Sequence, residues 1–316
     1  AQEEGVHPRP QGPCPLAAVP AGPHFLHCTP PRERAIPHDL LAMVHASLGD
    51  RYRVERELGR GGAARIFSAR DNTGRLVALK ILHPELLPSL TAKRFLREIG
   101  FLKELHHPHI APLLDFGEAD WLLYFVMPCF EGPTLRQHLA EVRRLPLREA
   151  CAVADDILDA LDYAHSKGIV HRDVKPENVV LSPESGTILV DFGIARAIAA
   201  SESDRVTRSG FTVGTSVYMS PEQAAGASQL DHRSDLYSLG CLLFECLTGQ
   251  PPFAHRVDAV VLDMHLRAAP PDARDLLPSL SRPLAKVLTT ALQKNPDDRW
   301  QSAAAMRQAL AASLGG

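Results

Sequence analysis

The sequence HRDVKPEN at residues 171–178, followed by a DFG that begins at Asp191, decides how this chain is best interpreted. Asp173 is a candidate base for a hydroxyl proton. Lys175 is a cation that can neutralise a transferring phosphoryl group. The side-chain oxygens of Asn178 and Asp191 are hard ligands of the kind that Mg²⁺ prefers.

The spacing of these residues strengthens this interpretation. In an extended loop, an Asp, a Lys and an Asn at positions i, i+2 and i+5 can converge on a γ-phosphate and its metal. The apolar stretch TILV at 187–190 predicts a strand that delivers the next carboxylate into a cleft. A polar loop with chance spacing is the alternative for each motif alone. The two aspartates, 18 residues apart, favour phosphoryl transfer when the motifs are considered together.

The composition is that of an ordinary globular protein. The chain has 316 residues, 45% hydrophobic and 22% charged, which suits one large domain or two lobes with a short tail. Its net charge of −3 gives no reason to expect nucleic acid or an anionic membrane as a partner. No stretch approaches the roughly 18 uncharged apolar residues that a membrane helix needs, so we expect no membrane segment in this chain.

The cysteine and histidine patterns argue against a metal or redox centre. The six cysteines include no C-x-x-C pair, and Cys241 and Cys246 fall in an apolar helical run where buried thiols are expected. A reducing, cytoplasmic setting fits this pattern best. His106, His107 and His109 have no acidic or cysteine companions, which favours a loop after a helix over a metal site.

Three regions are expected along the chain. Residues 1–49 are a proline-rich arm, predicted to be largely disordered, with a short helix at 38–48. Residues 50–130 are rich in strand patterns, and residues 131–316 are mostly helical. The fold class is therefore α+β, with a small β-rich lobe, a larger helical lobe and a ligand cleft between them. Strands are expected at 52–59, 64–70, 76–82, 110–116, 122–127, 178–181 and 187–190, and helices at 90–105, 134–142, 148–166 and from Asp235 onward.

The small lobe holds two candidates for phosphate binding. GRGGAA at 59–64 lies between strand patterns, which favours a glycine-rich hairpin that covers phosphates. A dinucleotide-binding turn would lead directly into a helix, and a simple flexible turn is the other alternative. Lys80 ends the motif VALK at 77–80, in a strand whose alternate residues should face a core, where a lysine needs a partner. Glu98 shares a helical stripe with Leu102 and Leu105 and is the expected partner, unless Lys80 is a surface lysine and the two are unrelated.

With these residues in place, the chain resembles the eukaryotic-like serine/threonine protein kinases over about residues 52–312. GTSVYMSPEQ at 214–223 and NPDDR at 295–299 look most like the bacterial branch, whose members are often cytoplasmic domains of receptor kinases. The resemblance implies a bilobal kinase fold, ATP and Mg²⁺ as cofactors, and transfer of phosphate to protein substrates. It implies a cytoplasmic location, for the chain itself or as part of a membrane-anchored parent. We also consider a homodimer that autophosphorylates in trans.

The resemblance assigns roles residue by residue. Asp173 would be the catalytic base, assisted by Lys175. Lys80 would bind the α- and β-phosphates and pair with Glu98. The metal ligands would be Asn178 and Asp191. The residues expected around ATP are Leu58, Gly59, Gly61, Gly62, Ile66, Ala78, Lys80, Met127, Pro128, Phe130 and Val180.

Further roles follow for the larger lobe. The lysine at 175 is the variant typical of serine/threonine kinases and argues against a tyrosine kinase. Thr215 would lie near the acceptor hydroxyl, Glu222 would pair with Arg299, and Asp235 would anchor the catalytic loop. Arg172 before the base implies an activation segment ordered by phosphate, although an ordinary polar loop is the alternative. The expected phosphosites are Thr207, Ser209 and Thr212.

Two residues depart from the pattern of the kinase family, and two other classes of protein are alternatives to an active protein kinase. Ala64 replaces the third loop glycine and adds only a methyl group, whereas Pro128 stiffens the hinge but keeps the carbonyl that adenine needs. A pseudokinase would lack at least one of the key polar residues, which are all present. A small-molecule kinase of the aminoglycoside type would lack the GT–SPE segment, which this chain has.

Overall fold

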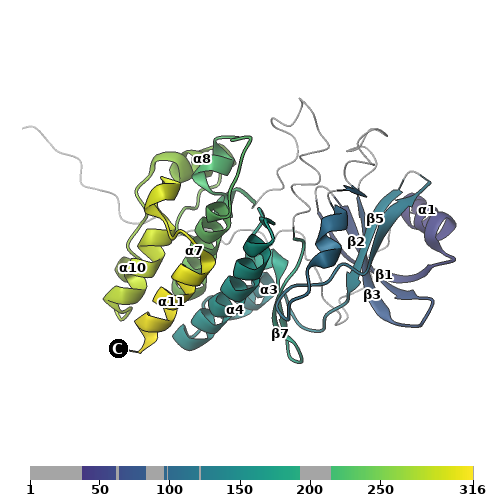
Figure 1. The fold of residues 1–316 in the computed structure, drawn as a ribbon, viewed down its shortest axis with the longest axis horizontal. Helices are drawn as coiled ribbons and strands as arrows, with labels where there is room; N and C mark the ends of the chain where they lie inside the picture. Colours follow the sequence, from purple (N-terminus) through teal and green to yellow (C-terminus); the bar gives the residue numbers. More distant parts are fainter. Residues whose placement is uncertain are drawn as a thin grey trace, which may run out of the picture.

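The computed structural model describes residues 38–61, 64–82, 96, 97, 99–120, 122–192 and 215–315. It has two lobes, a smaller one built on a β-sheet and a larger one built mostly of helices, in agreement with the predicted fold class (Figure 1). The sheet of the small lobe is antiparallel throughout, with the strand order β1-β2-β3-β5-β4. Its strands are β1 (Tyr52–Arg60), β2 (Ala64–Asp71), β3 (Leu76–Leu82), β4 (Asp115–Ala119) and β5 (Leu122–Pro128).

Helix α1 (His38–Leu48) forms where the amphipathic stretch predicts it. Its Val44 and Leu48 pack in one core with Phe67 and Tyr124 of the sheet. Alternate side chains of the same strands point to the opposite face and belong to the larger core, because successive residues of a strand face opposite sides. Helix α1 therefore covers the outer face of the sheet, on the side away from the helical lobe (Figure 1).

The segment before β4 differs from the expectation. A strand is predicted at 110–116, whereas β4 begins only at Asp115. Ile110 instead forms an isolated bridge with Leu189 of the larger lobe, and the Ala111 N–H donates to the Leu189 carbonyl at 3.0 Å. The first half of the predicted strand therefore joins the two lobes and does not extend the sheet.

The helix predicted at 90–105 is described only in its second half. Residues 96, 97, 99 and 100 are helical, and a 3₁₀ turn, η2 (Phe101–Glu104), follows. Leu102 and Leu105 are buried, as their stripe predicts. Glu98, on the same stripe, lies outside the described residues.

The larger lobe is assembled around helix α7 (Arg233–Thr248), whose residues from Ser234 to Leu247 are all buried. This confirms the prediction of a buried helix beyond Asp235. Cys241 and Cys246 in this helix are buried as expected, and burial raises the pKa of both thiols, which disfavours the reactive thiolate. The other helices are α3 (Leu135–Val142), α4 (Leu147–Ser166), α6 (Pro221–Ala224), α8 (Asp258–Arg267), α9 (Ala273–Leu276), α10 (Arg282–Ala291) and α11 (Ala303–Leu314).

Short elements lie between these helices along the chain. The strands predicted at 178–181 and 187–190 pair as a hairpin, β6 (Val179–Ser182) and β7 (Gly186–Leu189). The described part of this lobe also contains the 3₁₀ turns η3 (Pro176–Asn178), η4 (Thr215–Tyr218) and η5 (Pro296–Asp298).

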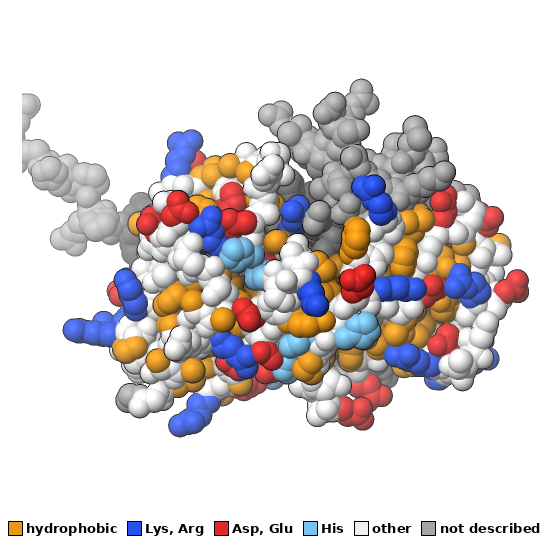
Figure 2. All heavy atoms as spheres, in the orientation of Figure 1, with side chains coloured by type: hydrophobic (Ala, Val, Ile, Leu, Met, Phe, Trp, Pro, Cys, Tyr) orange, Lys and Arg blue, Asp and Glu red, His pale blue; other side chains and the backbone are white. Residues whose placement is uncertain are grey.

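On the face seen in Figure 2, basic and acidic side chains are interspersed over both lobes, and neither sign gathers into one large patch. Among the described residues, no helix has both the length and the apolar character needed to cross a membrane.

Candidate active site

The motif HRDVKPEN folds into a loop that ends in the 3₁₀ turn η3. The Asn178 Nδ2 donates to the backbone oxygen of Asp173 at 2.8 Å and to its carboxylate Oδ2 at 2.9 Å. The Lys175 Nζ lies 2.8 Å from the same Oδ2. Burial alone would lower the pKa of Lys175, but the charge of Asp173 and the hydrogen bond to it outweigh burial and raise this pKa. The loop thus presents a carboxylate beside a permanent cation.

Lys80 and Asp191 meet where the two lobes face each other. The Lys80 Nζ donates to Asp191 Oδ2 at 2.7 Å, and each side chain is only 9% exposed. The Asp191 Oδ1 is buried and has no hydrogen-bond partner among the described residues. Asp191 has a φ of 64°, a left-handed value that is costly for a non-glycine residue and is maintained only when its surroundings hold it.

These oxygens fit a divalent cation. A buried carboxylate oxygen without a donor is unfavourable unless a cation contacts it. Because Asn178 uses its NH₂ group on Asp173, its Oδ1 remains as a second oxygen that could contact a cation. In the described part of the chain, no group of three or more His, Cys, Asp or Glu side chains is arranged for a metal. Mg²⁺ needs only one or two protein ligands when nucleotide phosphates supply the others.

Asp235 of α7 holds the loop at 171–178 by its backbone. Its Oδ2 accepts from the His171 N–H at 2.8 Å, and its Oδ1 accepts from the Arg172 N–H at 2.7 Å. Arg172 has a φ of 69°, so these two bonds help to hold a strained backbone in place. The His171 Nε2 lies 2.9 Å from the Val190 carbonyl, which ties the loop to the segment that carries Asp191.

The apolar residues expected around ATP come from both lobes. Gly61 donates its N–H to the Ala64 carbonyl at 2.8 Å and so closes the hairpin between β1 and β2. Across the strands, Ile66 lies opposite Gly59 and Lys80, and Ala78 lies opposite Met127. One buried cluster that extends over both lobes contains Leu58, Ile66, Ala78, Met127 and Val180, with Phe130 packed against it.

Pro128 ends β5 opposite Val77, at the edge of the sheet pairing. A proline is tolerated there because the end of a strand does not need every ladder hydrogen bond. Its position directly after the buried Met127 places it at the connection between the lobes.

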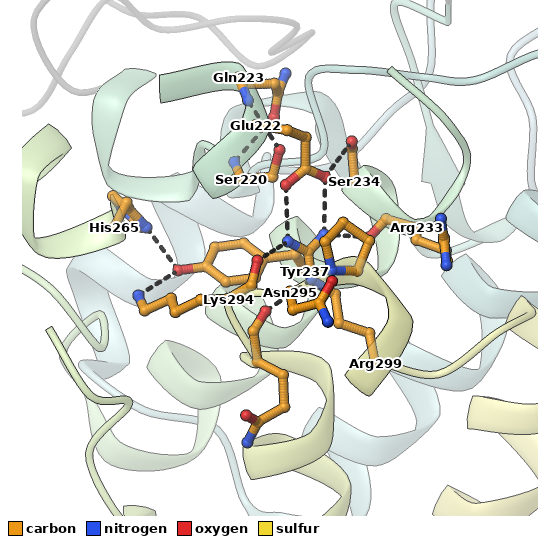
Figure 3. A network of polar contacts seen from close by, with 12 residues as sticks. Ser220, Glu222, Gln223, Arg233, Ser234, Tyr237, His265, Lys294, Asn295 and Arg299 are labelled. Atoms are coloured by element: carbon orange, nitrogen blue, oxygen red, sulfur yellow. Dashed lines mark hydrogen bonds and ion pairs between the residues drawn. The ribbon is translucent and has the colours of Figure 1, made fainter. Parts of the chain in front are cut away.

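Glu222 and Arg299 form a bidentate ion pair, with Nη1–Oε1 and Nη2–Oε2 distances of 2.8 and 2.7 Å (Figure 3). The Ser234 hydroxyl donates to the same carboxylate at 2.6 Å. Burial alone would raise the pKa of Glu222, but the hydrogen bonds from Arg299 and Ser234 outweigh burial and lower it. This pair joins α6 to the turn after η5.

Several of the expected site residues cannot be placed. Glu98, Gly62, Thr207, Ser209 and Thr212 lie outside the described residues. Their roles therefore remain predictions. The backbone of Thr215 begins η4, immediately before residues that pack against α7 and α8.

A polar cluster around Arg136 was missed in the sequence. Arg136 of α3 donates to Glu177 in the catalytic loop at 2.9 Å and to Glu245 of α7 at 2.7 Å. It also donates to the Tyr218 hydroxyl, which itself donates to Glu245. The signal that could have revealed the cluster is Glu245, because a glutamate inside an otherwise apolar helix needs a buried cation.

Comparison with known proteins agrees with this geometry. The family model for the protein kinase domain matches residues 52–311. The serine/threonine-protein kinase PknB of Mycobacterium tuberculosis is 43% identical over 272 residues, which cover 83% of this chain and 43% of that protein. PknB of Mycobacterium leprae is 42% identical over 270 residues, with the same two shares. The DNA damage-responsive serine/threonine-protein kinase RqkA of Deinococcus radiodurans is 42% identical over 264 residues, or 82% of this chain and 39% of that protein. The matched region is thus less than half the length of these relatives.

Proposed function

Because the chain belongs to the protein kinase domain family, we propose that it transfers the γ-phosphate of ATP to serine and threonine hydroxyls of protein substrates. The observation that carries the proposal is the convergence of Lys175 and Asn178 on the carboxylate of Asp173, each within hydrogen-bond distance of it. A second cation and carboxylate, Lys80 and Asp191, meet at the junction of the lobes. This is the arrangement of charges that phosphoryl transfer requires.

Each of these residues has a distinct task in the proposed reaction. The Asp173 carboxylate accepts the proton of the substrate hydroxyl as that oxygen bonds to the γ-phosphorus, and the bond from the γ-phosphorus to its bridging oxygen breaks so that ADP leaves. The charged Lys175 beside it stabilises negative charge on the phosphoryl oxygens. Lys80 would bind the phosphates of ATP, and Asn178 and Asp191 would hold Mg²⁺. Mg²⁺ held there would supply positive charge that offsets the negative charge of the phosphates.

The experiment that tests this proposal replaces Asp173 by Asn. Because a positioned base contributes about 10²–10⁴-fold, phosphate incorporation into a generic protein substrate should fall by that factor, while ATP binding persists. Asp263→Asn is a matched control, since Asp263 is 59% exposed on α8. Unchanged turnover in the Asp173 variant would refute the assignment of the base. A wild-type chain that binds ATP but transfers no phosphate would favour a pseudokinase.

We propose further that the domain is activated by autophosphorylation of Thr207, Ser209 or Thr212. Arg172 is the residue that would contact the phosphate. Its backbone N–H is held by Asp235, next to the proposed base Asp173. Replacing Thr207 and Ser209 by Ala should lower activity and remove phosphate from this segment. Mass spectrometry of active enzyme that finds no phosphate between residues 201 and 214 would exclude this mode of activation.

Whether the reaction occurs between copies of the chain can be tested with the same base variant. For a homodimer that autophosphorylates in trans, wild-type enzyme should phosphorylate the inactive Asp173→Asn chain. Phosphate found only on the wild-type chain would contradict that arrangement. We propose a cytoplasmic location, where ATP is available as the co-substrate. Protease added outside intact cells that produce the parent protein tests it, and digestion of this domain under those conditions would contradict a cytoplasmic location.

A further inference from the structure

A chain of hydrogen bonds connects the buried interior of the larger lobe to η4, the turn that begins at Thr215. The Lys294 Nζ donates to the Tyr237 hydroxyl at 3.3 Å. That hydroxyl lies 2.9 Å from the His265 Nδ1, and the His265 Nε2 lies 3.1 Å from the Val217 carbonyl. Figure 3 shows His265 and Lys294 meeting at the Tyr237 hydroxyl, beside the Glu222–Arg299 pair.

The chemistry of the first member sets the direction of the whole chain. An ammonium group can only donate, so the Tyr237 oxygen accepts from Lys294 and its own hydrogen is directed to Nδ1 of His265. A neutral imidazole with an acceptor at Nδ1 carries its hydrogen on Nε2. That hydrogen is therefore donated to the carbonyl of Val217.

The surroundings keep His265 in this neutral form. Its side chain is fully buried, and Phe253 packs edge-on against the ring with centroids 5.0 Å apart. Lys294 also contacts Phe253, with its Nζ 4.1 Å from the ring centroid. Burial first, and then the charge of Lys294, lower the pKa of His265 to about 4. The ring is thus a fixed donor near neutral pH.

The carbonyl that receives this bond belongs to a turn with two other anchors. The Ser216 hydroxyl donates to Asp258 at the start of α8 at 3.1 Å, and Tyr218 donates to Glu245. Val217 lies between Ser216 and Tyr218 in the sequence. Among the described residues, His265 is the one whose side chain hydrogen-bonds to the Val217 carbonyl. A turn held on consecutive residues has little freedom to rotate its first residue, Thr215.

We propose that His265, oriented by Tyr237 and Lys294, is a positioning residue that fixes η4 as the platform for the protein substrate. This inference rests on the proposed kinase function, because the platform matters only if a protein hydroxyl docks near Thr215. Its effect is expected in the KM for the protein substrate. The KM for ATP should not change, because the nucleotide residues of the small lobe are not part of this hydrogen-bond chain.

The test compares four variants of the full chain. His265→Asn keeps an amide near the place of Nδ1 but cannot reach Val217, whereas His265→Gln places an amide N–H near the position of Nε2. Tyr237→Phe removes only the hydroxyl that orients the ring. Ser238→Ala is the matched control, because Ser238 lies next to Tyr237 in α7 and its hydroxyl is also buried. Within the described residues, that hydroxyl donates to the Ser234 carbonyl and not to η4.

Loss of one such hydrogen bond should raise the KM for a protein substrate roughly five- to tenfold in His265→Asn, with the KM for ATP unchanged. His265→Gln should recover most of this loss, and the protein KM of Tyr237→Phe should lie between that of His265→Asn and that of the Ser238→Ala control.

Equal protein KM values for His265→Asn, His265→Gln and wild type would overturn the proposal. So would an equal loss in both His265 variants that also affects the KM for ATP, because that pattern indicates a packing role. If His265→Asn does not fold, Tyr237→Phe with an unchanged protein KM overturns the proposal. A wild-type chain without kinase activity would refute the proposed function instead.

Discussion

Replacing Arg299 by methionine should destabilise the larger lobe by about 3–5 kcal/mol, the usual cost of removing one partner of a buried ion pair. The Arg299 side chain is 0% exposed, and its five N–H groups all donate. Two of them bind Glu222, and the other three bind the carbonyls of Arg233, Gln293 and Lys294. Methionine has similar length but no donor, so it leaves a partly buried carboxylate and three carbonyls without their partner.

Thermal and denaturant unfolding at pH 7 measure this loss. At about 2–4 °C per kcal/mol for a domain of this size, the melting temperature should fall by about 6–20 °C. The matched control is Arg267→Met, which removes a pair with Asp263 that is 78% and 59% exposed and should change stability by less than about 0.5 kcal/mol. In a double-mutant cycle, Glu222→Gln should reduce the effect of Arg299→Met, because the two residues interact directly. Equal shifts for the variants at 299 and 267 would refute this reasoning.

Three other predictions concern packing, pH and metal. Gly240→Ala should cost about 1–3 kcal/mol, because its Cβ would lie 2.8 Å from the Ala291 Cβ, whereas Gly315→Ala, with nothing within 4 Å, should be neutral in the same unfolding assay. Between pH 6.5 and about 4, His265 binds a proton in the unfolded state but not in the folded state, so the free energy of unfolding should fall by up to about 3 kcal/mol as the pH is lowered. The denaturant midpoint of His265→Gln, measured over the same pH range, should lack this part of the decline. ADP with Mg²⁺ at about 100 times its Kd should stabilise the wild-type chain by about 2.7 kcal/mol, and Asp191→Asn should lose the Mg²⁺-dependent part of the shift in melting temperature.

The parts of the site that lie close together in the sequence could be predicted from it. The catalytic loop, the hairpin that leads to Asp191 and the buried helix after it depend on local spacing and hydrophobic periodicity, which a single sequence displays directly. The strand predicted at 110–116 shows the limit of that signal. Its apolar residues are buried or half-buried, but Ile110 pairs with the larger lobe, and periodicity does not state which partner such a residue has.

The family resemblance supplied the long-range Glu222–Arg299 pair, which no local pattern predicts. For Arg136 with Glu245, and for His265 with Val217, neither pattern nor resemblance indicated a contact. These partners are 109 and 48 residues apart, and both contacts depend on how helices pack around α7. The sequence by itself therefore determined the chemical groups of the site and the elements that carry them. Only the tertiary structure decided which buried charges and carbonyls satisfy one another, because that pairing is set by burial and distance between segments and not by their order along the chain.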